Sequence, residues 1–154
     1  MHENSMLEMA KFAATLPDKP LRIGDVGSQD FNGCYRRLFA RWDYVGLDIA
    51  RGPNVDIVLV SDWSNAGTFD VVVSGQVLEH VAQPWRWMEK IARIMRPDGL
   101  LCVIAPNTFP FHEYPIDAWR VWPAGMCGLF DHAGLETINA YASGDDTVGI
   151  ARLA

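Results

Sequence analysis

The 154-residue sequence predicts an α/β fold with a doubly wound, mostly parallel sheet. Short runs rich in β-branched residues recur along the chain, and most are apolar throughout instead of alternating, as expected for strands covered on both faces. Helical patterns lie between several of these runs. In such sheets, ligands bind beyond the carboxyl ends of the strands. We therefore expect the functional site to consist of the residues that end each strand.

The expected strands cover residues 21–27, 44–49, 55–60, 69–75 and 100–106. Two further strand candidates, at 135–142 and 147–154, are joined by the turn-rich sequence Ser-Gly-Asp-Asp. Strands joined in this way predict an antiparallel hairpin at the end of the sheet. Together these runs predict a sheet of seven strands.

The expected helices cover residues 1–16, 32–42, 84–95 and 123–134. Ser5 and Glu8 have the spacing of a capping box, which predicts the start of the first helix. The last two helices begin at Pro84 and Pro123, because proline is favoured in the first turn of a helix. The sequence Arg-Pro-Asp-Gly at 96–99 predicts where the third helix stops.

Length and composition bound the class of protein. We expect one domain over 1–154, with an N-terminal helix at 1–16 and a core at 21–154, because no linker, repeat or tail is visible. The formal net charge of −6 argues against a nucleic-acid partner. No run approaches the roughly 18 apolar residues of a membrane span, and no signal peptide is visible, so we expect a soluble, cytoplasmic protein.

Cysteine and histidine spacing predicts no metal site. The cysteines are Cys34, Cys102 and Cys127, and the histidines are His2, His80, His112 and His132. The cysteines are odd in number and far apart, which is typical of reduced structural thiols. The histidines form no ligand cluster along the chain, and we therefore expect no bound metal.

Polar residues end several of the expected strands. Asp25 and Gly27 end the first strand, and Asp48 ends the second. Gly27 lets the backbone approach a ligand, and a helix beginning after Gly33 would offer free N–H groups to a carboxylate or phosphate. Asp48 lies where an acidic side chain accepts hydrogen bonds from two ribose hydroxyls.

Four stretches, "IGDVGSQDFNG", "YVGLDI", "FDVVVSGQVLEHV" and "IMRPDGLLCVIAPN", occur in this order. They resemble the successive motifs of class I S-adenosylmethionine-dependent methyltransferases, especially the methyltransferase type 11 group. The resemblance covers about residues 21 to 141. It implies a Rossmann-like sheet, S-adenosylmethionine as cofactor and S-adenosylhomocysteine as product.

The resemblance also implies roles for individual residues at the cofactor site. The residues implied to bind the cofactor are Asp25, Gly27, Ser28, Gln29, Asp48, Ile49, Asp62, Trp63, Ser74, Gly75 and Gln76. Asp48 would bind the ribose, Ile49 would pack on the adenine, and Asp62 with Trp63 would hold the adenine edge and face. Gln29 stands where the family usually has a second glycine. Either the loop is longer here, or Gln29 takes the conformation of that glycine.

Methyl transfer from a sulfonium is a direct displacement, so it needs alignment and a dry pocket more than it needs a metal. A hydroxyl acceptor also requires a base to remove its proton. His80 and His112 are the candidates. The plainer alternatives are that His80 completes a helix end and that His112 braces its loop.

The segment from Ala105 to Met126 is rich in proline and aromatic residues, which predicts a stiffened wall over the acceptor. The candidate acceptor residues are Tyr114, Asp117, Trp119 and Arg120. They suit a small polar ring compound such as a saccharide. Alternatively, Asp117 and Arg120 form a structural ion pair, and the aromatic residues simply pack. Because little chain precedes the first strand, a second hypothesis is that a homodimer completes the enclosure.

Two other functions stay open at this point. A catalytically silent partner protein could keep the same fold without transferring a methyl group. An NAD-dependent oxidoreductase would share an acidic residue after the second strand. It would, however, require Gly-x-Gly-x-x-Gly, and Gln29 argues against that loop.

Overall fold

The structure is a computed structural model that describes residues 2–154. The strands are β1 (Arg22–Val26), β2 (Asp43–Asp48), β3 (Ile57–Val58), β4 (Phe69–Gly75), β5 (Met95–Pro106), β6 (Leu135–Ser143) and β7 (Asp146–Leu153). The α-helices are α1 (Glu3–Ala14), α2 (Pro84–Ile94) and α3 (Pro123–His132). Two short 3₁₀ helices, η1 (Arg36–Phe39) and η2 (Leu78–His80), lie between strands.

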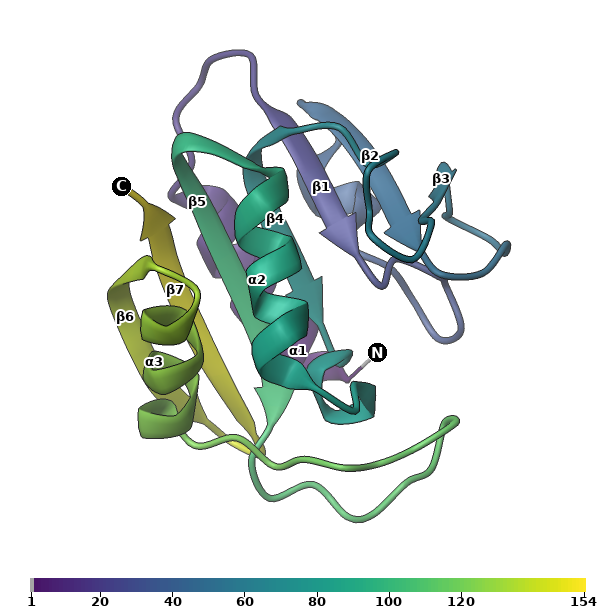
Figure 1. Cartoon of the computed structure of the whole chain (residues 1–154), viewed down its shortest axis with the longest axis vertical. Helices are drawn as coiled ribbons and strands as arrows, with labels where there is room; N and C mark the ends of the chain where they lie inside the picture. Colours follow the sequence, from purple (N-terminus) through teal and green to yellow (C-terminus); the bar gives the residue numbers. More distant parts are fainter. Residues whose placement is uncertain (1) are drawn as a thin grey trace.

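The seven strands form one sheet in the order β3-β2-β1-β4-β5-β7-β6 (Figure 1). Strands β1 to β5 are parallel, whereas β7 pairs antiparallel with both β5 and β6. This arrangement confirms the predicted doubly wound, mostly parallel α/β sheet and its C-terminal hairpin. Within residues 2–154, no helix combines the length and the apolar character needed to cross a membrane.

Hydrophobic cores cover both faces of the sheet. Helices α2 and α3 cover one face, and α1 covers the other together with η1 (Figure 1). Along β4, Val72 packs in the core beneath α2, whereas Val71 and Val73 pack in the core beneath α1. Successive side chains of a strand point to opposite faces, so a strand buried on both faces is apolar at every position.

The helix predicted over 32–42 is wrong, because only the single 3₁₀ turn η1 forms there. Tyr35, just before η1, is 1% exposed and lies against Gly75, where an added Cβ would come within 1.7 Å of the tyrosine hydroxyl. The Tyr35 hydroxyl also hydrogen-bonds to the Ser5 hydroxyl. Burial of Tyr35 and Phe39 between α1 and the sheet therefore outweighs the local helical pattern.

Other boundaries also differ from the prediction. Helix α1 already begins at Glu3, so Ser5 lies inside it and makes no cap, and the predicted capping box is wrong. The Arg-Pro-Asp-Gly sequence does follow α2, but it belongs to β5, where the pairing with β4 shifts register between Phe69 and Val71. In the expected strand at 55–60, only Ile57 and Val58 pair with β2.

Candidate active site

The carboxyl ends of β1, β2, β4 and β5 meet at one edge of the sheet, and the segment of residues 107–122 runs beneath this edge (Figure 1). Two contacts hold the segment against the rest of the protein. Ala118 N donates to the Glu79 carbonyl oxygen at 2.8 Å, and the Tyr114 ring meets the Phe31 ring edge to face with centroids 5.1 Å apart. Because Phe31 follows β1, the 107–122 segment spans from β5 to the loop after β1.

The loop after β1 turns tightly against the end of β2. Gly27 has a φ of +79°, and an added Cβ would lie 2.2 Å from a methyl carbon of Val77. The backbone N–H groups of Gly27 and Ser28 both donate to the Leu47 carbonyl oxygen. After Gly33 only the 3₁₀ turn η1 forms, starting at Arg36, so the predicted anion-binding helix is wrong.

The end of β2 presents a carboxylate beside an exposed apolar side chain. The Asp48 carboxylate is half-buried and accepts hydrogen bonds from Gln29 N at 3.0 Å and from Ile49 N at 2.7 Å. The Ile49 side chain is 78% exposed. Gln29 also donates from its side chain to the Arg51 carbonyl oxygen at 3.4 Å. A carboxylate and a free apolar surface side by side suit a ribose with an attached base.

Asp25 and Ser28 lie deeper than the sequence suggests. The Asp25 carboxyl is buried and accepts a hydrogen bond from the Tyr44 hydroxyl, and burial raises its pKa to about 7. Ser28 is also buried, and its hydroxyl donates to the Asn54 carbonyl oxygen at 2.9 Å. The side chains of Asp25 and Ser28 therefore shape the loop from within and do not reach its surface.

The two residues expected to hold the adenine, Asp62 and Trp63, point into different surroundings: one side chain is exposed and the other is buried. The Asp62 carboxylate is exposed and accepts a hydrogen bond from Ser64 N at 3.0 Å. Trp63 is 7% exposed and packs in the core beneath α2, with the Lys90 ammonium 5.7 Å from its ring centre. The Trp63 ring is therefore occupied by protein contacts.

The end of β4 carries a polar group without a partner. Ser74 donates from its hydroxyl to the Val26 carbonyl oxygen at 2.7 Å, joining β4 to β1. Gln76 has a φ of +60° and donates from Nε2 to Asp146 at 2.9 Å. Its Oε1 is buried and has no hydrogen-bond partner among the described residues. A buried acceptor of this kind is available to a ligand.

Two histidines meet at the same edge, which corrects the expectation that the histidines form no cluster. The rings of His80 and His112 lie edge to face, with centroids 5.1 Å apart. His80 Nδ1 hydrogen-bonds to the Ile116 carbonyl oxygen, and His112 Nδ1 lies 3.1 Å from the Pro110 carbonyl oxygen. A carbonyl can only accept, so Nδ1 carries a proton in each ring, and neither Nε2 atom has a hydrogen-bond partner among the described residues.

Glu79 lies beside this histidine pair, although the sequence motifs predicted no role for it. Its side chain is fully buried in η2, and neither carboxylate oxygen has a hydrogen-bond partner among the described residues. Oε1 is 3.6 Å from His80 Nε2. Burial raises the pKa of Glu79 to about 8. The sequence did contain a signal for this residue, because a glutamate inside the apolar run "QVLEHV" indicates a buried carboxyl group with a shifted pKa.

Asp117 and Arg120 form a structural ion pair, the alternative expected from the sequence to a role in acceptor binding. The Arg120 guanidinium donates to the two Asp117 oxygens at 2.6 and 2.8 Å, and holds the pKa of that carboxyl well below its usual range. Arg120 also donates to the Phe109 and Pro110 carbonyl oxygens. Asp117 accepts from His112 N at 2.6 Å. The pair therefore organises the 107–122 segment and positions His112.

The aromatic residues of this segment divide into two roles. Trp119 donates from its indole N–H to the Val81 carbonyl oxygen at 2.8 Å and packs edge to face on Trp85. Tyr114 and Phe111 are 62% and 71% exposed. A cavity of about 330 Å³ is lined by Phe109, Phe111 and residues 117–120.

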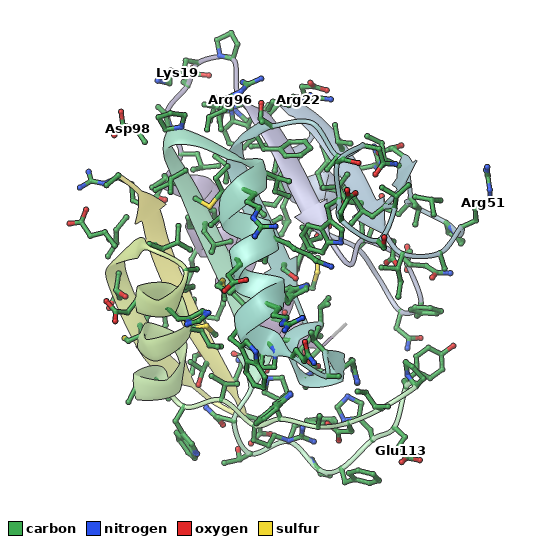
Figure 2. All side chains as sticks on the ribbon, in the orientation of Figure 1. Lys19, Arg22, Arg51, Arg96, Asp98 and Glu113 are labelled. Atoms are coloured by element: carbon green, nitrogen blue, oxygen red, sulfur yellow. The ribbon has the colours of Figure 1, made fainter. Side chains whose placement is uncertain are left out.

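A second cavity of about 400 Å³ lies at the other end of the edge, beside the loop after β2. It is lined by Arg51, Gly52, Val55, Asp56, Ile57, Val58 and Asn65. Figure 2 shows Arg51 and Glu113 on the outside of their loops, while Lys19, Arg22 and Arg96 gather at the opposite end of the sheet. The basic side chains near β1 therefore lie far from the candidate site.

Comparison with known proteins identifies the family. Residues 9–141 match the family described as "Methyltransferase domain". A Mycobacterium tuberculosis strain H37Rv protein named "Probable S-adenosylmethionine-dependent methyltransferase" is 34% identical, over 79% of this chain and 54% of that protein. The ubiquinone biosynthesis O-methyltransferase of Caulobacter vibrioides is 37% identical, over 40% of this chain and 24% of that protein.

Solved structures show the same fold. The 1,6-didemethyltoxoflavin-N1-methyltransferase of Burkholderia thailandensis, solved with S-adenosylhomocysteine, superposes with a TM-score of 0.79. The match has 13% identity and covers 99% of this chain and 79% of that one. The chain spans about half the length of the mycobacterial relative, or less than half for the Caulobacter enzyme. The chain belongs to the S-adenosylmethionine-dependent methyltransferase family.

Proposed function

We propose that the chain transfers the methyl group of S-adenosylmethionine to a hydroxyl oxygen of a small molecule, a class that includes saccharides. The observation that carries this proposal is the pair of imidazoles, His80 and His112, which meet at the carboxyl edge of the sheet with Nδ1 bound to a backbone carbonyl in each ring. A hydroxyl acceptor needs a group that removes its proton, whereas an amine that is already neutral does not.

The cofactor would lie across the ends of β1, β2 and β4. Asp48 and the exposed side chain of Ile49 suit the ribose and adenine, and the exposed carboxylate of Asp62 follows β3, the neighbour of β2 in the sheet. The partnerless Oε1 of Gln76 can accept a hydrogen bond from the cofactor's ammonium group. The tight turn at Gly27 lets the backbone approach the methionine portion. These groups match a ligand with a ribose at one end and an amino acid at the other.

The cofactor supplies a methyl group on a positively charged sulfur, which an aligned oxygen can attack directly. The Nε2 atom of His80 or His112 would accept the acceptor's proton. Glu79 Oε1, 3.6 Å from His80 Nε2, would stabilise the imidazolium that forms. Asp117 would keep His112 in place through the hydrogen bond from its backbone N–H.

The 107–122 segment would form the acceptor wall. Its exposed rings, Phe111 and Tyr114, offer apolar faces beside the cavity at Asp117–Arg120. Aromatic faces close to polar groups suit rings that carry hydroxyls. The Caulobacter relative is an O-methyltransferase, which supports oxygen as the acceptor atom. Whether a second subunit completes this wall is a separate hypothesis, which sedimentation of the active enzyme tests.

The test is methyl transfer from labelled cofactor to a panel of sugars, glycans and phenols. His80→Ala and His112→Ala should each lower kcat by about 100-fold or more if the residue acts as the base, with S-adenosylhomocysteine affinity unchanged. His132→Ala is the matched control, because His132 lies at the end of α3, away from the candidate site, and its Nε2 hydrogen-bonds to Glu89 at 2.8 Å. A chain that binds the cofactor but labels nothing in the panel would favour the silent-partner alternative.

A further inference from the structure

Glu79 is not satisfied in either of its protonation states. As a carboxylate it would be a buried charge, and the nearest guanidinium, that of Arg120, is already bound bidentately to Asp117. As a protonated acid it would need an acceptor for its O–H, but neither oxygen has a hydrogen-bond partner among the described residues, and His80 Nε2 lies 3.6 Å from Oε1, beyond hydrogen-bond distance. Buried polar groups in native proteins almost always have a partner. A missing ligand therefore explains Glu79 better than a proton does.

The neighbours of Glu79 have the chemistry of metal ligands. One ligand atom each from Glu79, His80 and His112 lie within 4.8 Å of one another. In both histidines, Nδ1 faces a backbone carbonyl, which fixes the tautomer and leaves Nε2 as the donor atom. Metal-binding histidines usually donate their second ring N–H to a carbonyl or carboxylate in this way.

We propose that Glu79, His80 and His112 bind one divalent metal ion such as Zn²⁺. Two imidazoles and one carboxylate suit zinc, iron, cobalt or nickel, whereas magnesium and calcium prefer oxygen ligands alone. Metal–ligand bonds of about 2.0–2.2 Å require the three atoms to draw together by roughly 1 Å. His112 stands on the 107–122 segment, so this movement needs only a small shift of that segment.

Three protein ligands leave at least one coordination position open, as in catalytic zinc sites. This part of the inference rests on the proposed function. A hydroxyl bound at the open position loses its proton to solvent more readily than a free hydroxyl. Its oxygen then bonds to the methyl carbon while the carbon–sulfur bond breaks, and sulfur keeps the electron pair. The ion would then replace the free imidazole as the group that activates the acceptor.

The test is calorimetric titration of the metal-depleted chain, without a histidine tag, with Zn²⁺ alone. We expect one ion per chain, with affinity lowered about 10-fold or more in both Glu79→Gln and His112→Asn. His132→Asn is the matched control and should leave the affinity unchanged, since His132 pairs only with surface Glu89. If Glu79→Gln does not fold, His112→Asn still tests the proposal, because its side chain lies in a surface segment.

Substitution with Co²⁺ gives a second readout, since the visible absorption of the ion reports imidazole and carboxylate ligation. A wild-type chain that binds no Zn²⁺, or whose affinity is unchanged in His112→Asn, overturns the proposal. No cofactor or acceptor is present in these titrations, so failure of methyl transfer to oxygen would leave their outcome unchanged. Full activity after removal of the metal would leave binding intact and overturn the catalytic role of the ion.

Discussion

The rings of Phe31 and Tyr114 meet edge to face with centroids 5.1 Å apart, joining the loop after β1 to the 107–122 segment. Both side chains are more than half exposed, at 57% and 62%, so the contact lies at the surface of the site. This aromatic contact joins the loop expected to bind the cofactor to the segment expected to form the acceptor wall. The two sides of the expected site are therefore joined by an exposed aromatic contact.

Tyr114→Ala should weaken this closure. An aromatic pair contributes roughly 0.5–1.5 kcal/mol beyond area burial, which corresponds to a loss of about 2- to 10-fold in S-adenosylhomocysteine affinity. Ile138→Ala is the control, because Ile138 is 53% exposed on β6, away from this edge. Calorimetry of both variants measures the effect. Equal affinity in Tyr114→Ala and the wild type would show that the segment does not close on the cofactor.

Gly27→Ala should destabilise the chain, because its φ of +79° is unfavourable for alanine and the added Cβ would lie 2.2 Å from a Val77 methyl carbon. The expected loss is roughly 1–3 kcal/mol in the free energy of unfolding. Gly128→Ala in α3 should do the opposite, gaining about 0.5–1 kcal/mol, since nothing lies within 4 Å of its added Cβ. Urea unfolding measures both, and a loss of the same size in the two variants would contradict the prediction.

Asp48→Ala should weaken S-adenosylhomocysteine binding by roughly 1–3 kcal/mol, the loss expected when a buried hydrogen-bonding partner is removed. Part of this loss comes through the loop, because Asp48 also accepts from Gln29 N at 3.0 Å. Asp43→Ala at the other end of β2 is the control, since Asp43 is exposed and its carboxylate lies 3.3 Å from Arg22. An unchanged affinity in Asp48→Ala would remove Asp48 from the site.

Asp25 should make stability depend on pH. Burial raises its folded pKa to about 7, above the roughly 3.9 of an unfolded aspartate. The folded chain therefore binds this proton more tightly, so the contribution is complete below about pH 4 and is lost as the pH rises through 7. The full loss is at most roughly 4 kcal/mol.

Asp25→Asn should remove this share of the pH dependence. Glu79, whose pKa burial raises to about 8, acts in the same direction, so only the difference between variant and wild type isolates Asp25. Urea unfolding across this pH range measures the two slopes. Identical slopes would mean that Asp25 ionises in the folded chain as an exposed aspartate does.

The strands were predictable because each carries its own signal in the sequence. Runs such as "FDVVVSG" are apolar at successive positions, and the structure explains why: Val71 and Val73 face one core and Val72 the other. The helix predicted over 32–42 failed for a tertiary reason. Burial of Tyr35 beneath Gly75 and its hydrogen bond to Ser5 depend on residues far away in the sequence.

The sequence predicted which residues lie at the strand ends, but it did not predict which groups their side chains contact. Asp25 and Ser28 stand in the expected loop, yet their side chains bond to Tyr44 and Asn54. The His80–His112 pair was hidden for a different reason. It depends on how the 107–122 segment folds back under the sheet, which the Asp117–Arg120 ion pair determines. No periodicity in the sequence carries that information.

Transfer of the methyl group to oxygen is tested most directly by nuclear magnetic resonance of a product made with isotope-labelled methyl on the cofactor. The chemical shift of the labelled carbon distinguishes a methyl on oxygen from a methyl on nitrogen or carbon. We expect an O-methyl product from the wild type and about 100-fold less of it from His80→Ala or His112→Ala. A labelled methyl on nitrogen or carbon, or the same O-methyl yield from both histidine variants, would contradict it.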